Sequence, residues 1–363
     1  MNVGLEGVGY RRGSENWIYP LNLRLQRGAP NVLLGTTGAG KTTLLRLMAG
    51  LDVPTAGRVL VGDRDVTGVA VRRRSVAMVY QQFINYPSLT VFENIASPLR
   101  VARRREADIH KRVGEIAEVL RLSPLLERLP SELSGGQQQR TALARALARD
   151  AELLLLDEPL ANLDYKLREE LREELAQLFA RQNTTVVYAT TDPLEALQLG
   201  GHTTVLDEGR LLQSGATIDV FRRPISLATA RAFSDPPLNV LPAVWDAPAM
   251  KLRLDAGPVM RLPSAAQQLL GGETRVVQLG MRPLQLRLSA GSDQCCALPG
   301  VVELAEISGS DTYLHLRHGQ TLLVAQIPGV HPLPLGSAWT LYVDPALVYG
   351  FSAGGDSLFA PEH

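Results

Sequence analysis

The sequence predicts an α/β domain built around a largely parallel sheet, followed by a smaller all-β domain. Over residues 1–235, apolar strand-like runs alternate with long amphipathic patterns, which is typical of α/β folds. Beyond residue 235 the runs are short and alternating, and Gly and Pro separate them. We therefore expect a domain boundary near residue 235 and a second domain over residues 236–363.

The elements of the first domain follow from apolar periodicity. NVLLG at residues 31–35 is a short continuous apolar run, which is typical of a strand buried on both faces. TTLLRLMAGL at residues 42–51 places its apolar residues at helical spacing. Further helices are predicted for KRVGEIAEVLRL (111–122), SGGQQQRTALARALAR (134–149) and YKLREELREELAQLFA (165–180), and further central strands for AELLLLDEP (151–159) and NTTVVYATT (183–191).

The second domain shows strand patterns without a long helix. Runs such as TYLHLRH (312–318) and TLLVAQI (321–327) alternate apolar and polar residues over the length of one short strand. Strands of this length suit a small barrel of the oligonucleotide/oligosaccharide-binding (OB) type.

Composition excludes some classes of partner. The 363 residues include 37 basic and 37 acidic side chains, so the net charge of +0 gives no global reason to expect nucleic acid or anionic lipid. The N-terminal stretch lacks the basic start and apolar core of a signal peptide, and no run of about 18 apolar residues occurs. We expect a cytoplasmic chain that does not span the membrane.

A phosphate-binding loop is predicted by GTTGAGKT at residues 35–42. It has the spacing GxxxxGK[ST], with a buried strand before it and an amphipathic helix after it. The glycines let backbone N–H groups face phosphate oxygens, Lys41 would neutralise the β/γ-phosphate charge, and the Thr42 hydroxyl would coordinate Mg²⁺. The residues predicted to bind ATP here are Gly35, Thr36, Thr37, Gly38, Ala39, Gly40, Lys41, Thr42 and Thr43.

A matching acidic pair ends the strand LLLLDEP at residues 153–159. Asp157 would hold the magnesium, and Glu158 would polarise the water that attacks the γ-phosphate. An acidic pair at a strand end is usually a surface turn, so this prediction depends on the phosphate loop upstream.

A second anion site is predicted by LSGGQQQR at residues 133–140. Its serine and glycines open a helix, so they present a hydroxyl, backbone N–H groups and a positive dipole end. Two phosphate-binding helix starts in one chain are explained if the second serves a nucleotide held by a neighbouring subunit. Its residues are Ser134, Gly135, Gly136 and Gln137.

With these three motifs, the first 235 residues resemble an ATP-binding-cassette (ABC) ATPase. The resemblance implies a P-loop ATPase domain with a helical subdomain at about residues 84–150. In that family two such domains sandwich two ATP molecules, and each site combines one subunit's phosphate loop with the other's LSGGQ. The resemblance therefore implies ATP and Mg²⁺ as cofactors and a second ATPase subunit as partner.

Further family positions are identified by the same resemblance. MVYQQFINYPSLTVFENI (78–95) is similar to the glutamine-loop region and places the catalytic, magnesium-contacting glutamine at Gln81 rather than Gln82. LANLD (160–164) resembles the loop in which Asp164 would communicate across the dimer.

An aromatic residue near the N-terminus should stack on adenine. Tyr10 is the first choice, but YRRGSENWIYP (10–20) is slightly lengthened relative to the family, so Trp17 and Tyr19 stay open.

The second domain resembles the regulatory domain of carbohydrate importers of the maltose type. The resemblance lies in FSDPPLNVLPA (233–243), LGMRPLQLRL (279–288) and VVELAEISGSDTYLHLRHGQTLLVA (301–325). It implies the energy-coupling subunit of a bacterial importer, peripheral at the cytoplasmic face of the inner membrane. Its partners would be two transmembrane permease subunits and, indirectly, a periplasmic solute-binding protein, with no nucleic acid.

A narrower resemblance favours a glycerol importer. YQQFINYPSLTVFENIASPLR (80–100) and YATTDPLEALQLGGHTTVL (188–206) are similar to one of the paired ATPase subunits of glycerol importers, with sn-glycerol 3-phosphate or a sugar as the next choices. Because the ATPase subunit does not touch the cargo, this assignment is analogy alone.

Thr191 departs from the family pattern. Most members have a histidine there, which bonds the γ-phosphate and orients water near the catalytic glutamate, whereas threonine is shorter and uncharged. One explanation is a tolerated substitution, with Thr190, Thr191 or a water bridging to the phosphate. The other, which we favour, is a heterodimer whose second subunit retains its histidine and supplies the faster site.

Two alternatives to an active importer ATPase are an ATP-binding regulatory subunit with little turnover and an ABC ATPase with a role outside transport. Measurable turnover after mutation of the partner subunit's catalytic glutamate would exclude the first, and stable co-purification with membrane permeases would exclude the second.

Overall fold

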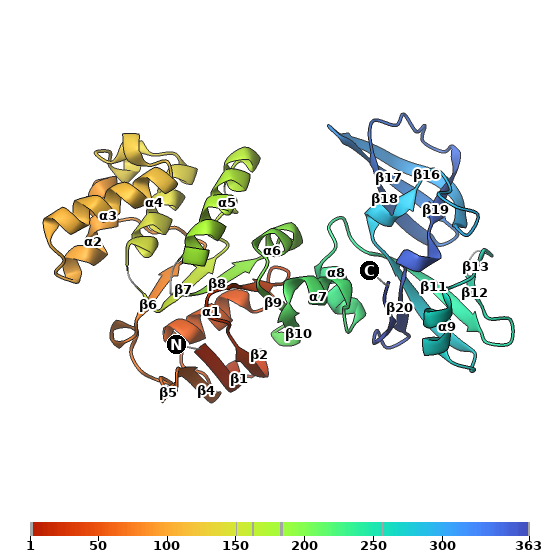
Figure 1. Cartoon of the computed structure of the whole chain (residues 1–363), viewed down its shortest axis with the longest axis horizontal. Helices are drawn as coiled ribbons and strands as arrows, with labels where there is room; N and C mark the ends of the chain where they lie inside the picture. The colour runs from red at the N-terminus through yellow and green to blue at the C-terminus, as the bar shows by residue number, and fades with distance from the viewer. Residues whose placement is uncertain (1–2, 150, 162, 182–183, 256, 362–363) are drawn as a thin grey trace. The chain divides into compact units, whose positions relative to one another are not determined.

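The computed structural model describes residues 3–149, 151–161, 163–181, 184–255 and 257–361 (Figure 1). Internal contacts divide the chain into a first unit, Met1–Thr217, and a second unit, Ile218–His363. The predicted fold class is confirmed, because the first unit is α/β and the second consists mainly of strands. The division precedes the boundary predicted at residue 235, since residues 218–235 bond to the second unit, for example through Ile225 O and Ser357 N.

The first unit is organised around a six-stranded sheet in the order β10-β9-β3-β8-β7-β6. Its central strands pair in parallel, and β10 alone runs antiparallel beside β9. The strands are β3 (Pro30–Leu34), β6 (Val76–Val79), β7 (Leu153–Asp157), β8 (Thr185–Thr190), β9 (His202–Asp207) and β10 (Arg210–Ala216).

Apolar runs explain the central strands. Every residue of β7, with sequence LLLLD, and of β8, with sequence TVVYAT, is buried, as expected for parallel strands covered on both faces. The carboxyl ends of β3, β7 and β8 therefore meet at one edge of the sheet, where the phosphate loop, the acidic pair and Thr191 follow them.

A second, antiparallel sheet in the order β2-β1-β4-β5 completes the core with helix α1 (Lys41–Ala49). Leu44, Leu45, Leu47 and Met48 of α1 pack in one apolar cluster with residues of both sheets. The strands are β1 (Val3–Arg12), β2 (Glu15–Arg24), β4 (Ala56–Val61) and β5 (Arg64–Asp65).

Helices α2, α3 and α4 contact one another at one side of the first unit, within the segment expected to form the helical subdomain (Figure 1). Residue 150, the expected end of that subdomain, lies outside the described residues. The remaining helices of the unit follow the acidic strand and β8. The bounds are α2 (Val91–Val101), α3 (Glu106–Val119), α4 (Gly135–Ala148), α5 (Tyr165–Arg181) and α6 (Pro193–Leu199).

The second unit contains two antiparallel sheets, in the orders β13-β12-β11-β14-β20-β21 and β15-β19-β16-β17-β18, which share one apolar core. Its strands are β11 (Asn239–Asp246), β12 (Lys251–Leu254), β13 (Val259–Met260), β14 (Arg275–Met281), β15 (Leu286–Arg287), β16 (Cys296–Ser308), β17 (Asp311–His318), β18 (Thr321–Pro328), β19 (Ala338–Val343), β20 (Tyr349–Ser352) and β21 (Ser357–Phe359). Its short helices are α8 (Leu227–Ala232) and α9 (Ser264–Leu270), and α7 (Thr217–Arg222) begins at the division.

Within the described part of the chain, the search for a helix with the length and hydropathy of a membrane span found none.

Candidate functional site

The loop between β3 and α1 requires glycine at several points. Gly38 and Gly40 have φ angles of 87° and 99°, a region that other residues rarely adopt. A side chain at Gly35 would lie 2.3 Å from the carbonyl oxygen of Leu206 in β9. The glycines therefore let the loop pack closely against the sheet and lead into the N-terminus of α1. The N-terminus of a helix favours an anion.

Lys41 lies inside this loop. Its side chain is 4% exposed, and its Nζ donates to the carbonyl oxygens of Gly35 (2.8 Å) and Thr36 (3.0 Å). The same Nζ is 3.5 Å from Oε1 of Glu158. Burial lowers the pKa of Lys41, and Glu158 opposes that shift. The loop thus places the ammonium group of Lys41 beside the carboxylate of Glu158, which follows β7.

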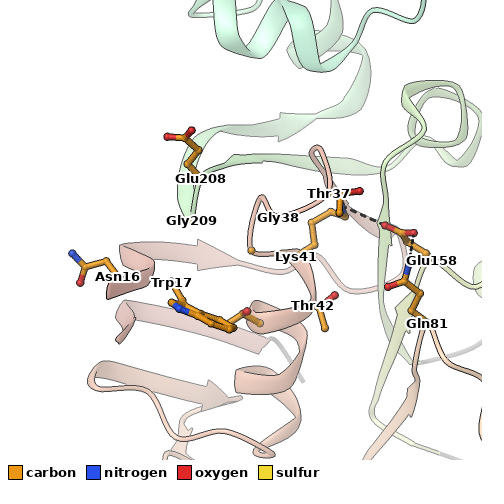
Figure 2. Close-up of a pocket in the computed structure, with 12 residues that line it drawn as sticks. Asn16, Trp17, Thr37, Gly38, Lys41, Thr42, Gln81, Glu158, Glu208 and Gly209 are labelled. Carbon is orange, nitrogen blue, oxygen red and sulfur yellow. Dashed lines mark hydrogen bonds and ion pairs between the residues drawn. The ribbon is translucent and has the colours of Figure 1, made fainter. Parts of the chain in front are cut away.

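Glu158 follows β7 in a left-handed backbone conformation, with φ at 47°. Its backbone N donates to the carbonyl oxygen of Ala189 in β8 at 3.0 Å, and its Oε2 accepts from Nε2 of Gln81 at 3.1 Å. Figure 2 shows Lys41 and Gln81 meeting this one carboxylate from two sides. The structure therefore brings together three residues that are far apart in the sequence.

Asp157 lies beside the loop and is 2% exposed. Burial raises its pKa, and a hydrogen bond with the Thr42 side chain partly opposes that effect. Thr42 and Asp157 consequently place a hydroxyl and a carboxylate side by side, a pair of oxygen donors of the kind that Mg²⁺ prefers.

Lys41, Thr42, Gln81 and Glu158 line a cavity of about 500 Å³ (Figure 2). One end holds the phosphate loop, Gln81 and Glu158. The other end is formed by the β1–β2 hairpin and by the turn between β9 and β10. The lining residues are Asn16, Trp17, Thr37, Gly38, Gly40, Lys41, Thr42, Thr43, Gln81, Glu158, Glu208 and Gly209.

The aromatic residue in this lining is Trp17. Its side chain is 39% exposed, and the Arg12 guanidinium lies 5.1 Å from its ring centroid. Tyr10, the first choice from the sequence, is half-buried against the apolar core and is absent from the lining. Tyr19 is also absent, and Arg210 covers its ring at 3.5 Å. The geometry thus favours Trp17 as the aromatic platform of the cavity.

Asn16, Glu208 and Gly209 are lining residues that the sequence reasoning did not name. The dipeptide Glu208–Gly209 between two strands is a turn signal, but only the fold shows that this turn reaches the phosphate loop, where Gly209 N donates to Ala39 O at 3.0 Å.

Ser134 and its neighbours begin α4, away from this lining. The Ser134 hydroxyl accepts from Gln137 N, and Gln137 Oε1 accepts from Ser134 N at 2.9 Å, which forms a capping box. Ser134 and Gly135 are exposed, and Gly136 is half-buried. The anion site predicted at this helix start is thus open to another molecule.

Asp164 is also exposed, and its Oδ1 accepts from Leu167 N at 2.9 Å in the first turn of α5. Its structural role is that of a helix cap.

Thr191 is exposed at the end of β8 and is absent from the lining of the cavity. Thr190 is buried, and its hydroxyl donates to Glu195 Oε2 at 2.6 Å. Thr190 is therefore engaged inside the fold, which argues against the suggestion that it bridges to the phosphate.

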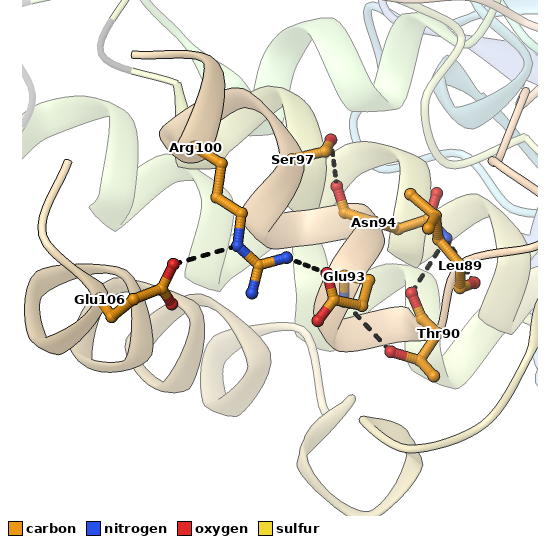
Figure 3. A network of polar contacts seen from close by, with 7 residues as sticks. All are labelled: Leu89, Thr90, Glu93, Asn94, Ser97, Arg100 and Glu106. Atoms are coloured by element: carbon orange, nitrogen blue, oxygen red, sulfur yellow. Dashed lines mark hydrogen bonds and ion pairs between the residues drawn. The ribbon is translucent and has the colours of Figure 1, made fainter. Parts of the chain in front are cut away.

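The loop that follows Gln81 is held by the buried Asn94 of α2. Its Nδ2 donates to the carbonyl oxygens of Leu89 (2.9 Å) and Thr90 (3.0 Å), and its Oδ1 accepts from Tyr86 N (2.8 Å). Figure 3 shows Asn94 beside the start of α2, which Thr90 caps.

Arg145 of α4 also holds this loop. It donates to the carbonyl oxygen of Ile84, and its guanidinium lies 4.7 Å from the ring centroid of Tyr86. The segment from Gln81 to Tyr86 thus connects the Glu158 carboxylate to helix α4.

The comparisons with known proteins follow the same division of the chain. The family model described as ABC transporter matches residues 18–161, and the model described as TOBE domain matches residues 279–351. The sn-glycerol-3-phosphate import ATP-binding protein UgpC of Shigella sonnei (strain Ss046) is 38% identical over 331 residues, which cover 91% of this chain and 92% of that protein. The chain belongs to the ABC transporter family.

Another relative of this ABC ATPase is the alpha-glucoside transport ATP-binding protein AglK of Rhizobium meliloti (strain 1021), which is 35% identical and spans 95% of this chain and 96% of its own. Among solved structures, the dimeric post-hydrolysis state of the ATP-binding cassette MJ0796 bound to ADP and Pi matches 59% of this chain and 98% of its own, at 32% identity and a TM-score of 0.54.

These findings confirm the resemblance of the chain to ATPase subunits of ABC importers. The chain is an ATP-binding subunit of the importer ATPase type, its activity is ATP hydrolysis coupled to transport, and membrane permeases are its partners.

Proposed function

We propose that the first unit hydrolyses ATP in the cavity lined by Lys41, Gln81 and Glu158, and so drives import of a small polyol or sugar. The observation that supports this proposal is the convergence of Lys41 and Gln81 on the Glu158 carboxylate beside the phosphate loop. Adenine would lie on Trp17 at the other end of the same cavity.

The chain's own groups suit in-line attack of water on the γ-phosphorus, with departure of ADP. Lys41 and the N-terminus of α1 stabilise the negative charge of the transferred phosphoryl group. The Glu158 carboxylate polarises the attacking water, and Gln81 holds that carboxylate in place from its Oε2 side.

Thr42 and Asp157 fit a magnesium ion, because they offer two adjacent oxygen donors and the buried Asp157 carboxylate lacks a full countercharge. Gln81 lines the same cavity as Thr42 and carries a further side-chain oxygen. Bound magnesium would neutralise phosphate charge.

Two ATPase subunits would share each ATP in this proposal. Ser134, Gly135, Gly136 and Gln137 are separate from the cavity of their own chain, and an exposed helix start suits a partner's nucleotide. Asp164 lies in the loop expected to face that partner.

The composition of this dimer is a separate question. The comparisons give no support for a heterodimer, so that prediction rests on Thr191 alone. Purification of the chain by itself tests it, because a lone chain that dimerises and hydrolyses ATP at the rate of the complex would contradict the asymmetric arrangement.

The cargo is proposed from relatives and from the two stretches that resemble glycerol importers. UgpC is named for sn-glycerol-3-phosphate import and AglK for alpha-glucoside transport. We place the chain at the cytoplasmic face of the inner membrane, beside its permeases and below a periplasmic binding protein. Recovery of these partners from native membranes, followed by ATPase assays with glycerol, sn-glycerol 3-phosphate and sugars, would identify the solute that stimulates turnover.

The decisive test of the site is Glu158→Gln. We expect ATP turnover to fall by about a hundredfold or more while ATP still binds, because glutamine keeps the shape of the Glu158 side chain but carries no negative charge. The matched control is Glu118→Gln, since Glu118 is an exposed residue of α3 outside the cavity. Unchanged turnover in Glu158→Gln would refute the proposed role.

A further inference from the structure

Behind Thr191 lies a buried polar cluster that the proposed chemistry does not use. Glu195 of α6 accepts two hydrogen bonds at Oε2, one from the Thr190 hydroxyl at 2.6 Å and one from the Tyr188 hydroxyl at 3.2 Å. Tyr188, Thr190 and Glu195 are 0%, 3% and 4% exposed. The carboxylate is therefore tied to β8 in an environment that excludes water.

The same cluster fixes the turn that carries Thr191. The Thr190 hydroxyl also accepts from Asp192 N at 3.0 Å, and Asp192 Oδ1 accepts from Leu194 N at 2.8 Å as the cap of α6. Thr191 thus lies between two residues whose positions are set by hydrogen bonds. Its own side chain is exposed and needs no such support.

This turn is joined to the catalytic carboxylate through one strand end. Glu158 N donates to the carbonyl oxygen of Ala189, the residue before Thr190. A shift of the end of β8 would therefore move Thr191 relative to Glu158. Such a shift of about 1 Å in a catalytic group can cost about a hundredfold in rate.

The cluster also faces α5. Arg172 is 4% exposed, contacts Glu169 through NH1 at 2.9 Å, and interacts electrostatically with Glu195. The Nε of Arg172 has no hydrogen-bond partner among the described residues. Arg172 of α5 thus places a positive charge on the side of Glu195 that faces α5, which favours the ionised form of this carboxyl.

We propose that Glu195 is a positioning residue for ATP hydrolysis, which holds the turn 190–192 so that residue 191 stays at a fixed distance from Glu158. This inference rests on the proposed function of the cavity. It assigns to Tyr188 and Thr190 the role of fixing Glu195, and none of the three touches the nucleotide.

The test measures kcat and KM for ATP with the full chain in the assembly that hydrolyses ATP. Thr190→Val keeps the shape of the side chain and removes the hydroxyl, whereas Thr190→Ser keeps the hydroxyl. We expect Thr190→Val to lower kcat about tenfold with KM changed less than about twofold, because the phosphate loop is untouched. We expect Thr190→Ser to restore most of kcat.

Tyr188→Phe provides a second variant in case Thr190→Val does not fold, and we expect the same fall in kcat with KM retained. A cluster that serves only stability would lower the melting temperature and leave kcat per folded molecule unchanged. That result, in either folded variant, would overturn the inference.

A double-mutant cycle with Thr191→His gives an independent readout. We expect Thr191→His to raise kcat about tenfold in the otherwise native chain and by less than about twofold beside Thr190→Val, because an imidazole on a displaced turn misses the phosphate. An equal effect in both backgrounds, or none in either, would contradict the positioning role.

Glu158→Gln separates the two proposals. If turnover survives Glu158→Gln, the proposed function of the cavity fails. If Glu158→Gln abolishes turnover and Thr190→Val leaves kcat unchanged, the function of the cavity stands and only the role of Glu195 fails.

Discussion

At the scale of single residues, Lys41 and Glu158 define the electrostatics of the cavity. The lysine is buried, so its charge would be costly without the two loop carbonyl oxygens and the nearby carboxylate. A phosphate group can replace these partners, because it offers several acceptors in the same place. The loop therefore holds Lys41 ready for an anion.

The exposed ring of Trp17 leads to a prediction about affinity for ATP. Trp17→Ala should raise KM for ATP by about tenfold, because the stacking of a base on an aromatic ring contributes about 1 to 3 kcal/mol. Trp17→Phe should retain most of the affinity. ATP titrations measure both variants.

The matched comparison is Tyr10→Ala. Because Tyr10 packs against the core, this variant should lose stability and keep KM for ATP near the native value. If Tyr10→Ala raised KM for ATP and Trp17→Ala left KM unchanged, Tyr10 would be the residue that stacks on adenine.

Asp157 gives a prediction about pH. Burial raises the pKa of Asp157 above its ordinary value of 3.8. Between pH 3.8 and the raised pKa, Asp157 is therefore more protonated in the folded chain than in the unfolded chain. This group therefore favours folding below pH 3.8 relative to neutral pH, and its contribution falls as pH rises through the raised pKa.

Asp157→Asn should remove this penalty. In the absence of nucleotide, we expect the variant to melt at a higher temperature than the native chain at pH 7, and the difference to shrink toward pH 4. Its magnesium-dependent ATP turnover should fall by about a hundredfold. A variant that melts lower than the native chain at pH 7 would contradict the stated sign.

Most residues of the phosphate end of the cavity could be predicted from the sequence, because each motif is local. The phosphate loop is one continuous stretch, and the acidic pair ends one strand. The other end of the cavity, where adenine is proposed to bind, could not be predicted in this way. It combines a hairpin near the N-terminus with a turn near residue 208, and only the folded sheet places them together.

At the scale of elements, the β1–β2 hairpin explains the choice between Tyr10 and Trp17. Its pairing is irregular, with shifts in register on both sides of Tyr10, and Tyr10 pairs with Ile18. A change of register by one residue exchanges the two faces of a strand. The sequence shows that the segment is lengthened but does not show where the shifts fall, so it left the aromatic residue open.

The glutamine loop gives a prediction at the same scale. Asn94→Ala removes the side-chain hydrogen bonds to Tyr86, Leu89 and Thr90, which should cost about 2 kcal/mol of unfolding free energy. Amide hydrogen exchange over residues 84–90 should accelerate.

Ser97→Ala is the control for this prediction. The Ser97 hydroxyl bonds only to the carbonyl oxygen of Asn94, one turn back in the same helix, among the contacts of the described residues. Exchange rates over residues 84–90 that match the native chain in Asn94→Ala would show that other contacts hold the loop.

At the scale of the whole chain, the change of fold from α/β to all-β follows from the change in residue pattern, and the sequence predicts both classes. The division itself is harder to locate, because α7 and α8 are short helices that resemble the end of the first domain. Their place in the second unit depends on a few hydrogen bonds to residues far along the chain, which the sequence pattern does not reveal.

Arg282 of the second unit makes several of those contacts. It donates to the carbonyl oxygens of Phe233 (2.7 Å) and Phe221 (2.9 Å), and its guanidinium lies 3.9 Å from the ring centroid of Phe221. Arg282→Met should lower the unfolding free energy of this unit by about 2 to 4 kcal/mol.

The exposed Arg287 provides the control, since Arg287→Met should leave thermal unfolding nearly unchanged. If Arg282→Met unfolds at the native temperature, the segment 218–235 is held by other contacts.

The left-handed backbone of Glu158 has a consequence for natural variation. At φ 47° a side chain costs about 1 kcal/mol or more relative to glycine. Glu158→Gly is reachable by a single nucleotide change and would relax that backbone. Under the proposed role of Glu158, this variant would be more stable and inactive, so the chain gives up stability at this residue in favour of the proposed chemistry.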